Sequence, residues 1–129
     1  MGDNCCCGNT NVLVYACSGG ANVAEVSDLA ARKLTKEGTG KMFCLAGLGA
    51  EIPGMVQAAR DADMNLVIDG CPMDCAKNIF DKSGLTNYKQ IKVTDLGIEK
   101  QSGVEVTATQ VDRVVEAARQ KLNDGNKTD

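Results

Sequence analysis

Seven cysteines are the residues of this chain best suited to chemistry, and histidine is absent. Without histidine the chain has no Ser-His-Asp or Cys-His catalytic group and no histidine-containing zinc site. A transition-metal site would therefore be built from thiolates, with or without a carboxylate. In a reducing compartment cysteines more often serve as metal ligands, catalytic thiols or core residues than as disulfides, and an odd number fits poorly with a fully paired secreted framework.

Two of the cysteines lie in the stretch IDGCPMDCAKN, residues 68–78. The spacing of Cys71 and Cys75 is Cys-x-x-x-Cys, which is neither a zinc-ribbon knuckle nor a thioredoxin motif. Pro72 is typical of the first turn of a helix, so we expect Cys71 to cap this helix and Cys75 to lie one turn along the same face. The positive end of a helix favours the thiolate form, which binds metal or acts as a nucleophile.

The strands and helices of the fold must position these thiols. Along the chain, short apolar runs alternate with amphipathic stretches. The runs predict strands at residues 12–16, 41–46, 65–68 and 90–96, with a short extra strand at 103–107. Such alternation is typical of right-handed βαβ units. We therefore predict an α/β fold: a three-layer α/β/α sandwich with a mostly parallel, four- to five-stranded sheet in the flavodoxin-like order 2-1-3-4.

This topology predicts that four cysteines meet at one edge of the sheet. Cys17 follows the first strand, Cys44 lies late in the second and Cys71 follows the third, with Cys75 close behind. Open α/β sheets bind their ligands beyond the carboxyl ends of the strands. Free cysteine is also a common small core residue, and for Cys44, placed inside a strand, core packing is an equally good interpretation.

A glycine-rich turn formed by Ser18, Gly19, Gly20 and Asn22 is a second candidate feature. Asn22, with Glu25 three residues later, predicts the N-cap of a helix, and backbone N–H groups at such a position can bind an anion. The turn is neither a Walker loop nor a dinucleotide fingerprint. It is a candidate subsite for a small anionic ligand, although a plain strand-to-helix connection explains the same residues.

Four blocks of sequence match a known family in order. They are VYACSGGANV, KMFCLAGLG, IDGCPMDCAKNIF and VTDLGIEK. On these blocks the chain resembles the DGC-domain family of small bacterial and archaeal proteins to which zinc binding is ascribed, and the motif that names the family is Asp69-Gly70-Cys71 here. The resemblance implies four chelating cysteines, which match Cys17, Cys44, Cys71 and Cys75, with zinc as the cofactor. It brings no established reaction.

Three functions are compatible with these residues, and they leave open whether the chain is an enzyme. The first is a zinc-binding protein with four thiolate ligands, whose excess negative charge would need helix ends, N–H donors or cations such as Lys77 and Lys100. The second is a thiol redox or sulfur-transfer enzyme with Cys71 as nucleophile and Cys75 or Cys17 as the resolving thiol. The third is an iron–sulfur protein, although the usual ferredoxin spacings are absent.

The composition limits the remaining possibilities. The chain has 129 residues, 43% of them hydrophobic, which suits one domain with a core. A net charge of −3 without a basic stripe argues against nucleic acid and anionic membranes as partners. No apolar run approaches the ~20 residues that span a bilayer, and the polar N-terminus lacks the apolar segment of a signal peptide, so we expect a cytoplasmic protein.

The domain organisation is predicted from the same patterns. Residues 1–11 are predicted to be a flexible cysteine-containing lead, 12–122 a single α/β domain and 123–129 a disordered tail. The lead holds Cys5, Cys6 and Cys7, which precede the first strand and therefore start at the edge opposite Cys17. A strand of about six residues separates the two edges by roughly 20 Å, so we predict that these three thiols are exposed and are not ligands of the main site.

Overall fold

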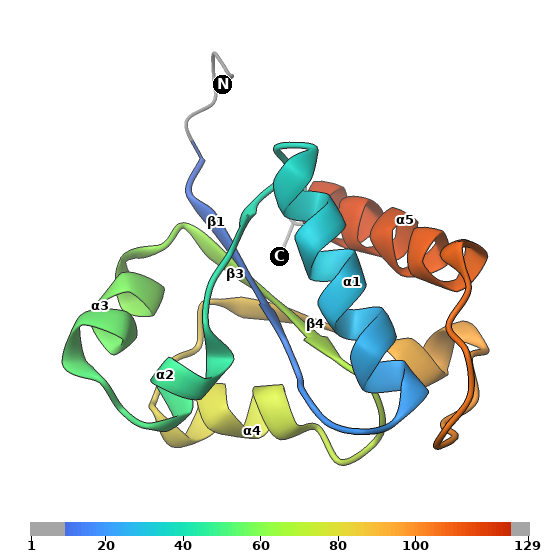
Figure 1. Ribbon diagram of the computed structural model, residues 1–129. Coiled ribbons are helices and arrows are strands. Elements are labelled where there is room, and N and C mark those ends of the chain that lie inside the picture. The colour runs from blue at the N-terminus through green and yellow to red at the C-terminus, as the bar shows by residue number, and fades with distance from the viewer. Residues whose placement is uncertain (1–9, 125–129) are drawn as a thin grey trace.

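A computed structural model describes residues 10–124 as one mixed α/β fold built on a parallel sheet (Figure 1). Its strands are β1 (Val12–Ala16), β2 (Lys41–Met42), β3 (Met64–Asp69) and β4 (Tyr88–Lys92). They are ordered β2-β1-β3-β4, and every neighbouring pair is parallel. The predicted fold class and strand order are confirmed, with four strands within the described residues.

Helices cover both faces of the sheet and complete the predicted sandwich. The helices are α1 (Asn22–Lys36), α2 (Leu45–Gly49), α3 (Pro53–Asp61), α4 (Cys75–Lys82) and α5 (Ala108–Asp124), together with the 3-10 turn η2 (Val93–Leu96). Helices α1 and α5 lie on one face, and α2, α3 and α4 on the other (Figure 1).

The central strands β1 and β3 are buried on both faces, as expected for a parallel sheet between two helical layers. Alternate residues of β1 point to opposite cores. Val14 packs in the cluster under α1 and α5, whereas Leu13 and Tyr15 pack with Phe80 of α4 in the other cluster. The loop after β1 and the turn before α4 lie together at the carboxyl end of the sheet, and α2 packs against the later part of α4 (Figure 1).

Two predicted strands have wrong bounds, and a third predicted strand does not form. The strand predicted at 41–46 ends at Met42, because the chain turns there into α2. The strand predicted at 90–96 is β4, which ends at Lys92, and the next four residues form η2, closed by Gly97 in the left-handed conformation. The extra strand predicted at 103–107 does not form: these residues are mostly exposed, and a single bridge between Ala21 and Ser102 is the only sheet-like contact nearby within residues 10–124.

The final helix begins with a capping box. The backbone N–H of Gln110 donates to Oγ1 of Thr107 (3.2 Å), and the backbone N–H of Thr107 donates to Oε1 of Gln110 (3.1 Å). The helix continues to Asp124, so the fold includes the first residues of the predicted tail. No helix of residues 10–124 is both long and apolar enough to cross a membrane. The prediction for Cys5, Cys6 and Cys7 lies outside the described residues.

Candidate functional site

Asp69, the last residue of β3, holds the beginning of helix α4. Its side chain is 1% exposed, and it accepts hydrogen bonds from the backbone N–H groups of Ala76 (2.7 Å) and Lys77 (3.1 Å) and from Nε2 of Gln90 (2.8 Å). A carboxylate that accepts the free N–H groups of a helix stabilises its first turn. Sequence reasoning missed this role, although an acidic residue directly after an apolar strand was a signal for it.

The turn between β3 and α4 differs from the prediction. Helix α4 begins at Cys75, not at Pro72, and residues 71–74 form a turn in which the Asp74 N–H donates to the Cys71 carbonyl (3.1 Å). Asp74 adopts the left-handed conformation there, with φ of 54°. The N-cap position is therefore Asp74 rather than Cys71, and the N–H groups of Ala76 and Lys77 are satisfied by Asp69. Cys71 is half-buried in the turn, and Cys75 is exposed at the first residue of the helix.

Cys17 is fixed to the same turn from the end of β1. It is 8% exposed, and its Sγ accepts a hydrogen bond from the backbone N–H of Gly70 (3.2 Å). Burial raises the pKa of the Cys17 thiol, the contacts with Gly70 and Ser27 work against this rise, and negative charge on Asp69 and Cys75 adds to it.

Gly70 makes this approach sterically possible. A Cβ atom at position 70 would lie 3.0 Å from both the carbonyl carbon and Cγ2 of Val23 in α1. The Gly70 carbonyl also accepts a hydrogen bond from the Thr94 N–H (3.1 Å). Both the packing and the hydrogen bonds therefore fix the position of the turn that carries Cys71.

Cys44 is the N-cap residue of α2, and it is exposed. Its Sγ accepts a hydrogen bond from the backbone N–H of Gly47 (3.3 Å). The prediction that Cys44 lies within a strand is wrong, and exposure also removes the interpretation of Cys44 as a core residue. Its neighbour Tyr15 is buried: burial raises the pKa of Tyr15 to about 12, and negative charge on Cys44 adds to the rise.

Asn22 connects the site to a distant segment. Its Nδ2 donates to the carbonyl of Glu99 (2.9 Å), its Oδ1 accepts from the N–H of Gln101 (2.7 Å), and its own N–H donates to the Gln101 carbonyl (2.9 Å). Asn22 is thus the first residue of α1 rather than its cap, which is Ala21. The contacts hold segment 99–101 across the end of the sheet.

Lys100, in the middle of that segment, reaches the candidate site. Its Nζ lies 3.5 Å from Sγ of Cys71 and donates a hydrogen bond to it. The other cation considered in the sequence analysis, Lys77, pairs instead with Asp81 (3.0 Å). One ammonium group is therefore in contact with a candidate thiolate.

The glycine-rich turn borders an open pocket of about 340 Å³. Ser18, Gly19 and Gly20 line it together with the carboxylates of Glu25 and Asp28. The side chain of Asn22 is already occupied by segment 99–101. An anion in this pocket would meet two acidic side chains, which is unfavourable for the predicted anionic subsite.

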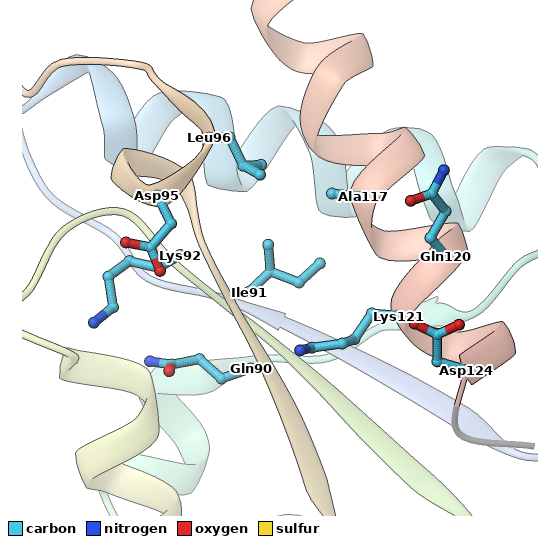
Figure 2. Close-up of a pocket in the computed structure, with 9 residues that line it drawn as sticks. All are labelled: Gln90, Ile91, Lys92, Asp95, Leu96, Ala117, Gln120, Lys121 and Asp124. Carbon is cyan, nitrogen blue, oxygen red and sulfur yellow. The ribbon is translucent and has the colours of Figure 1, made fainter. Parts of the chain in front are cut away.

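A second pocket lies away from the cysteines, between β4 and the second half of α5 (Figure 2). It measures about 250 Å³, and its charged lining groups are of both signs: Lys92, Lys121, Asp95 and Asp124. None of the residues that line it is a cysteine. It contributes nothing to the thiol site.

Cys17, Cys71 and Cys75 lie around the turn between β3 and α4, Cys44 begins α2, and the four do not form a finished metal site. Among residues 10–124, no three Cys, Asp or Glu side chains are grouped so that they could hold a metal ion as they stand. Cys17 and Cys71 are joined through the Gly70 turn, whereas Cys44 and Cys75 are exposed at the starts of two helices. Ligation of one ion by all four sulfurs would require the exposed side chains to turn inward.

Comparisons with known proteins agree with the sequence motifs. The model of the DGC domain matches residues 13–118. The anaerobic and virulence modulator AnvM of Pseudomonas aeruginosa is 31% identical over 115 residues, which cover 89% of this chain and 88% of AnvM. The crystal structure of Zn(II)-bound AdcA from Streptococcus pneumoniae is similar with a TM-score of 0.45 and 19% identity, and this chain spans 26% of that chain. A likeness this weak to AdcA carries no argument about a site.

Proposed function

The chain belongs to the DGC-domain family, and from this premise we propose that it is a thiolate metal-binding protein with zinc as its ion. The proposed ligands are Cys17, Cys44, Cys71 and Cys75. Thiolates are soft ligands that suit Zn²⁺, and a site of four thiolates is structural, whereas a site of three leaves a position open for water.

The observation that carries this proposal is the set of N–H donors directed at the sulfurs. Three of the four accept one: Cys17 from Gly70 (3.2 Å), Cys44 from Gly47 (3.3 Å) and Cys71 from Lys100 (3.5 Å). A Zn²⁺ ion with four thiolates carries two excess negative charges, and hydrogen bonds to the ligand atoms stabilise such charge. The donors therefore suit sulfurs that become anionic.

The lack of a finished cluster is compatible with the donor chemistry. Metal binding to thiols is coupled to their deprotonation and to ordering of the ligands. Cys17 would form the fixed side of the site, because it is buried and bonded to the backbone. Cys44 and Cys75 would supply the adjustable side, because both are exposed.

Zinc titration against a competing chelator tests the proposal. The lead thiols can scavenge metal, so the titration uses the full chain with serine at positions 5–7 as its reference protein. This reference should bind about one equivalent of zinc, and Cys71→Ser or Cys75→Ser should remove most of it. A folded, metal-free reference whose four remaining thiols all react freely with a thiol reagent would refute zinc binding.

The Cys44→Ser variant determines the number of ligands. Loss of affinity in that variant would support four thiolates. If it keeps full zinc content and affinity, the site has three thiolates and an open fourth position.

Thiol chemistry at Cys71 is the second candidate function, and the Lys100 ammonium 3.5 Å away favours it. A cation next to a thiol favours the nucleophilic thiolate. In this alternative the Cys71 thiolate attacks a disulfide, a mixed disulfide forms and one thiolate leaves; attack by Cys75 or Cys17 would then release the second thiolate. Lys100→Met should slow alkylation of Cys71, with Lys77→Met as the matched control.

Spectra of protein purified without oxygen separate these candidates from an iron–sulfur protein. A zinc protein is colourless, whereas an iron–sulfur cluster absorbs visible light and is brown. Elemental analysis of the same sample identifies the metal. A colourless sample without metal, with a fast-reacting Cys71, would favour thiol chemistry.

The anionic subsite at the glycine-rich turn stays a separate proposal. Titration with phosphate, sulfate and small carboxylates, followed by amide chemical shifts, tests it. Shifts of the Gly19 and Gly20 amides would support the subsite. Because Glu25 and Asp28 line the pocket, the same titration with a small amine is the matched control.

A further inference from the structure

The side chains of Cys71 and Lys100 meet although they are 29 positions apart in the sequence, with Nζ of Lys100 3.5 Å from Sγ of Cys71. Cys71 is a free, half-buried thiol and Lys100 is exposed, so a small oxidant in solvent can reach the pair. A cysteine sulfur that is oxidised to a sulfenic acid condenses with a neighbouring thiol or nitrogen atom. The Lys100 amine is therefore placed to react with an oxidised Cys71.

The fold holds the backbone on the lysine side of this contact. Asn22 is 6% exposed and bonds the residues on either side of Lys100: its Nδ2 donates to the Glu99 carbonyl (2.9 Å), and its Oδ1 accepts the Gln101 N–H (2.7 Å). The Asn22 N–H adds a third bond, to the Gln101 carbonyl (2.9 Å). Movement of the Lys100 side chain alone can therefore bring Nζ to the sulfur.

The backbone on the cysteine side is held as well. The Asp74 N–H donates to the Cys71 carbonyl (3.1 Å), and the Thr94 N–H donates to the Gly70 carbonyl (3.1 Å). The Cys71 side chain packs at the edge of the core under α1 and α5. A bond between the two side chains would therefore form without rearrangement of either backbone segment.

We propose that hydrogen peroxide joins Sγ of Cys71 to Nζ of Lys100 in a reversible sulfenamide bond. The Cys71 thiolate attacks a peroxide oxygen, the O–O bond breaks, and a sulfenic acid and hydroxide form. The hydroxide takes a proton from the Lys100 ammonium and becomes water. The lone pair of the resulting amine attacks the sulfur, so that an S–N bond forms, the S–O bond breaks, and the departing hydroxide leaves with an amine proton as a second water. The sulfur loses two electrons, and they reduce the peroxide.

The bond acts as a reversible lock on the site. It ties the turn that carries Cys71 to segment 99–101 and removes the Cys71 sulfur from other reactions. A dithiol reductant returns the free thiol and the amine and is itself oxidised to a disulfide, whereas oxidation to sulfinic acid would be irreversible. The inference goes beyond both proposed functions, because it needs neither a metal ion nor a disulfide substrate.

Peptide mapping after peroxide treatment tests the bond. The sample is the metal-free reference protein with serine at positions 5–7, and its remaining thiols are alkylated before digestion. Trypsin cleaves after Lys and Arg, so Cys71 falls in peptide 61–77, and a blocked Lys100 leaves peptide 93–113 uncut. The expected product is these two peptides joined with the loss of two hydrogen atoms, and a dithiol should separate them.

Two substitutions at position 100 separate the amine from its charge. Lys100→Met removes both, whereas Lys100→Arg keeps a positive charge next to the sulfur but has no amine to form the bond. Neither variant should give the joined peptides. Lys121→Met, in a pocket that no cysteine lines, should give them as the reference does. Urea unfolding of each untreated variant shows whether it is folded.

Thermal unfolding supplies a second readout. A cross-link between residues 71 and 100 restricts the unfolded chain, so peroxide should raise the unfolding midpoint of the reference protein, and either a dithiol or Lys100→Met should abolish the rise.

Three results would each overturn the inference. They are a disulfide between Cys71 and Cys75 within peptide 61–77, oxidation of Cys71 to sulfinic acid with no joined peptides, and joined peptides that persist in Lys100→Met. The first would favour Cys75 as the resolving thiol of the second candidate function, and none of the three bears on zinc binding.

Discussion

Replacement of Asp69 by asparagine tests whether this side chain holds helix α4 in place. The wild-type carboxylate accepts three hydrogen bonds, from the N–H groups of Ala76 and Lys77 and from Nε2 of Gln90. Asparagine has nearly the same shape but offers one oxygen and one NH₂ group. One of the two carboxylate positions would therefore present a donor to another donor.

The expected cost follows from these contacts. Loss of a helix cap destabilises a protein by about 0.5–2 kcal/mol, and a buried donor left unpaired costs about 1–3 kcal/mol more. Asp69 is fully buried, so water cannot replace the lost partner. Together these terms predict a decrease of about 2–4 kcal/mol in the free energy of unfolding.

Urea unfolding measures the effect. With an m-value of about 2 kcal/mol/M, the midpoint should fall by roughly 1–2 M. Asp61→Asn is the matched control, because Asp61 is exposed at the end of α3 and accepts one hydrogen bond, from the side chain of Gln57. The control should change stability by less than about 0.5 kcal/mol. Equal midpoints for the two variants would show that Asp69 does not hold the helix.

Three further predictions concern protons and the segment that carries Lys100. Zinc affinity should rise with pH, because each ligand thiol must lose its proton to bind the metal. The rise should continue above the pH range in which ordinary thiols titrate, because burial raises the pKa of Cys17. A zinc affinity that does not change with pH, measured by chelator competition, would contradict this. Asn22→Ala should speed hydrogen exchange of the Gln101 amide by about tenfold or more, because it removes the Asn22 acceptor of that N–H; unchanged exchange would show that Asn22 does not pin the segment. The hydrogen bond from Arg119 holds the pKa of Glu37 below its usual value. The contribution of this interaction to the free energy of unfolding is therefore full above the unfolded-state pKa of Glu37 and is lost as pH falls through the lower folded-state pKa. The urea midpoints of wild type and Arg119→Ala should differ at neutral pH and converge in acid.

The sequence predicted the sheet well because strand order follows from local signals. The apolar runs of β1 and β3 are buried on both faces and read directly as central strands, and the alternation with helices implies parallel pairing. Chain order and right-handed crossovers then leave few arrangements. The positions of Cys17 after β1 and of Cys71 after β3 followed from this framework, whereas the start of α4 did not.

Residues whose partners are distant in sequence were mispredicted. Asn22 followed by Glu25 has the local pattern of a capping box, but Asn22 bonds instead to segment 99–101, nearly eighty residues away, and the fold alone brings that segment to it. Residues 41–46 have strand-like apolar side chains, but Phe43 and Leu45 pack in the core under α4, so Cys44 turns outward as a cap. Tertiary contacts overrode local propensity in both places.

The fold requires two residues of the motif Asp69-Gly70-Cys71 and does not require the third. Asp69 is needed by helix α4, and Gly70 is needed because a side chain there would collide with Val23. Both would be required in a protein that bound nothing. Cys71 is less constrained: its carbonyl closes the turn, which any residue can do, and its half-buried side chain packs at the edge of the core under α1 and α5, with its sulfur next to the ammonium of Lys100. The sulfur at this position is therefore the part of the motif that the proposed metal or thiol chemistry would use, and Asp69 and Gly70 fix its position.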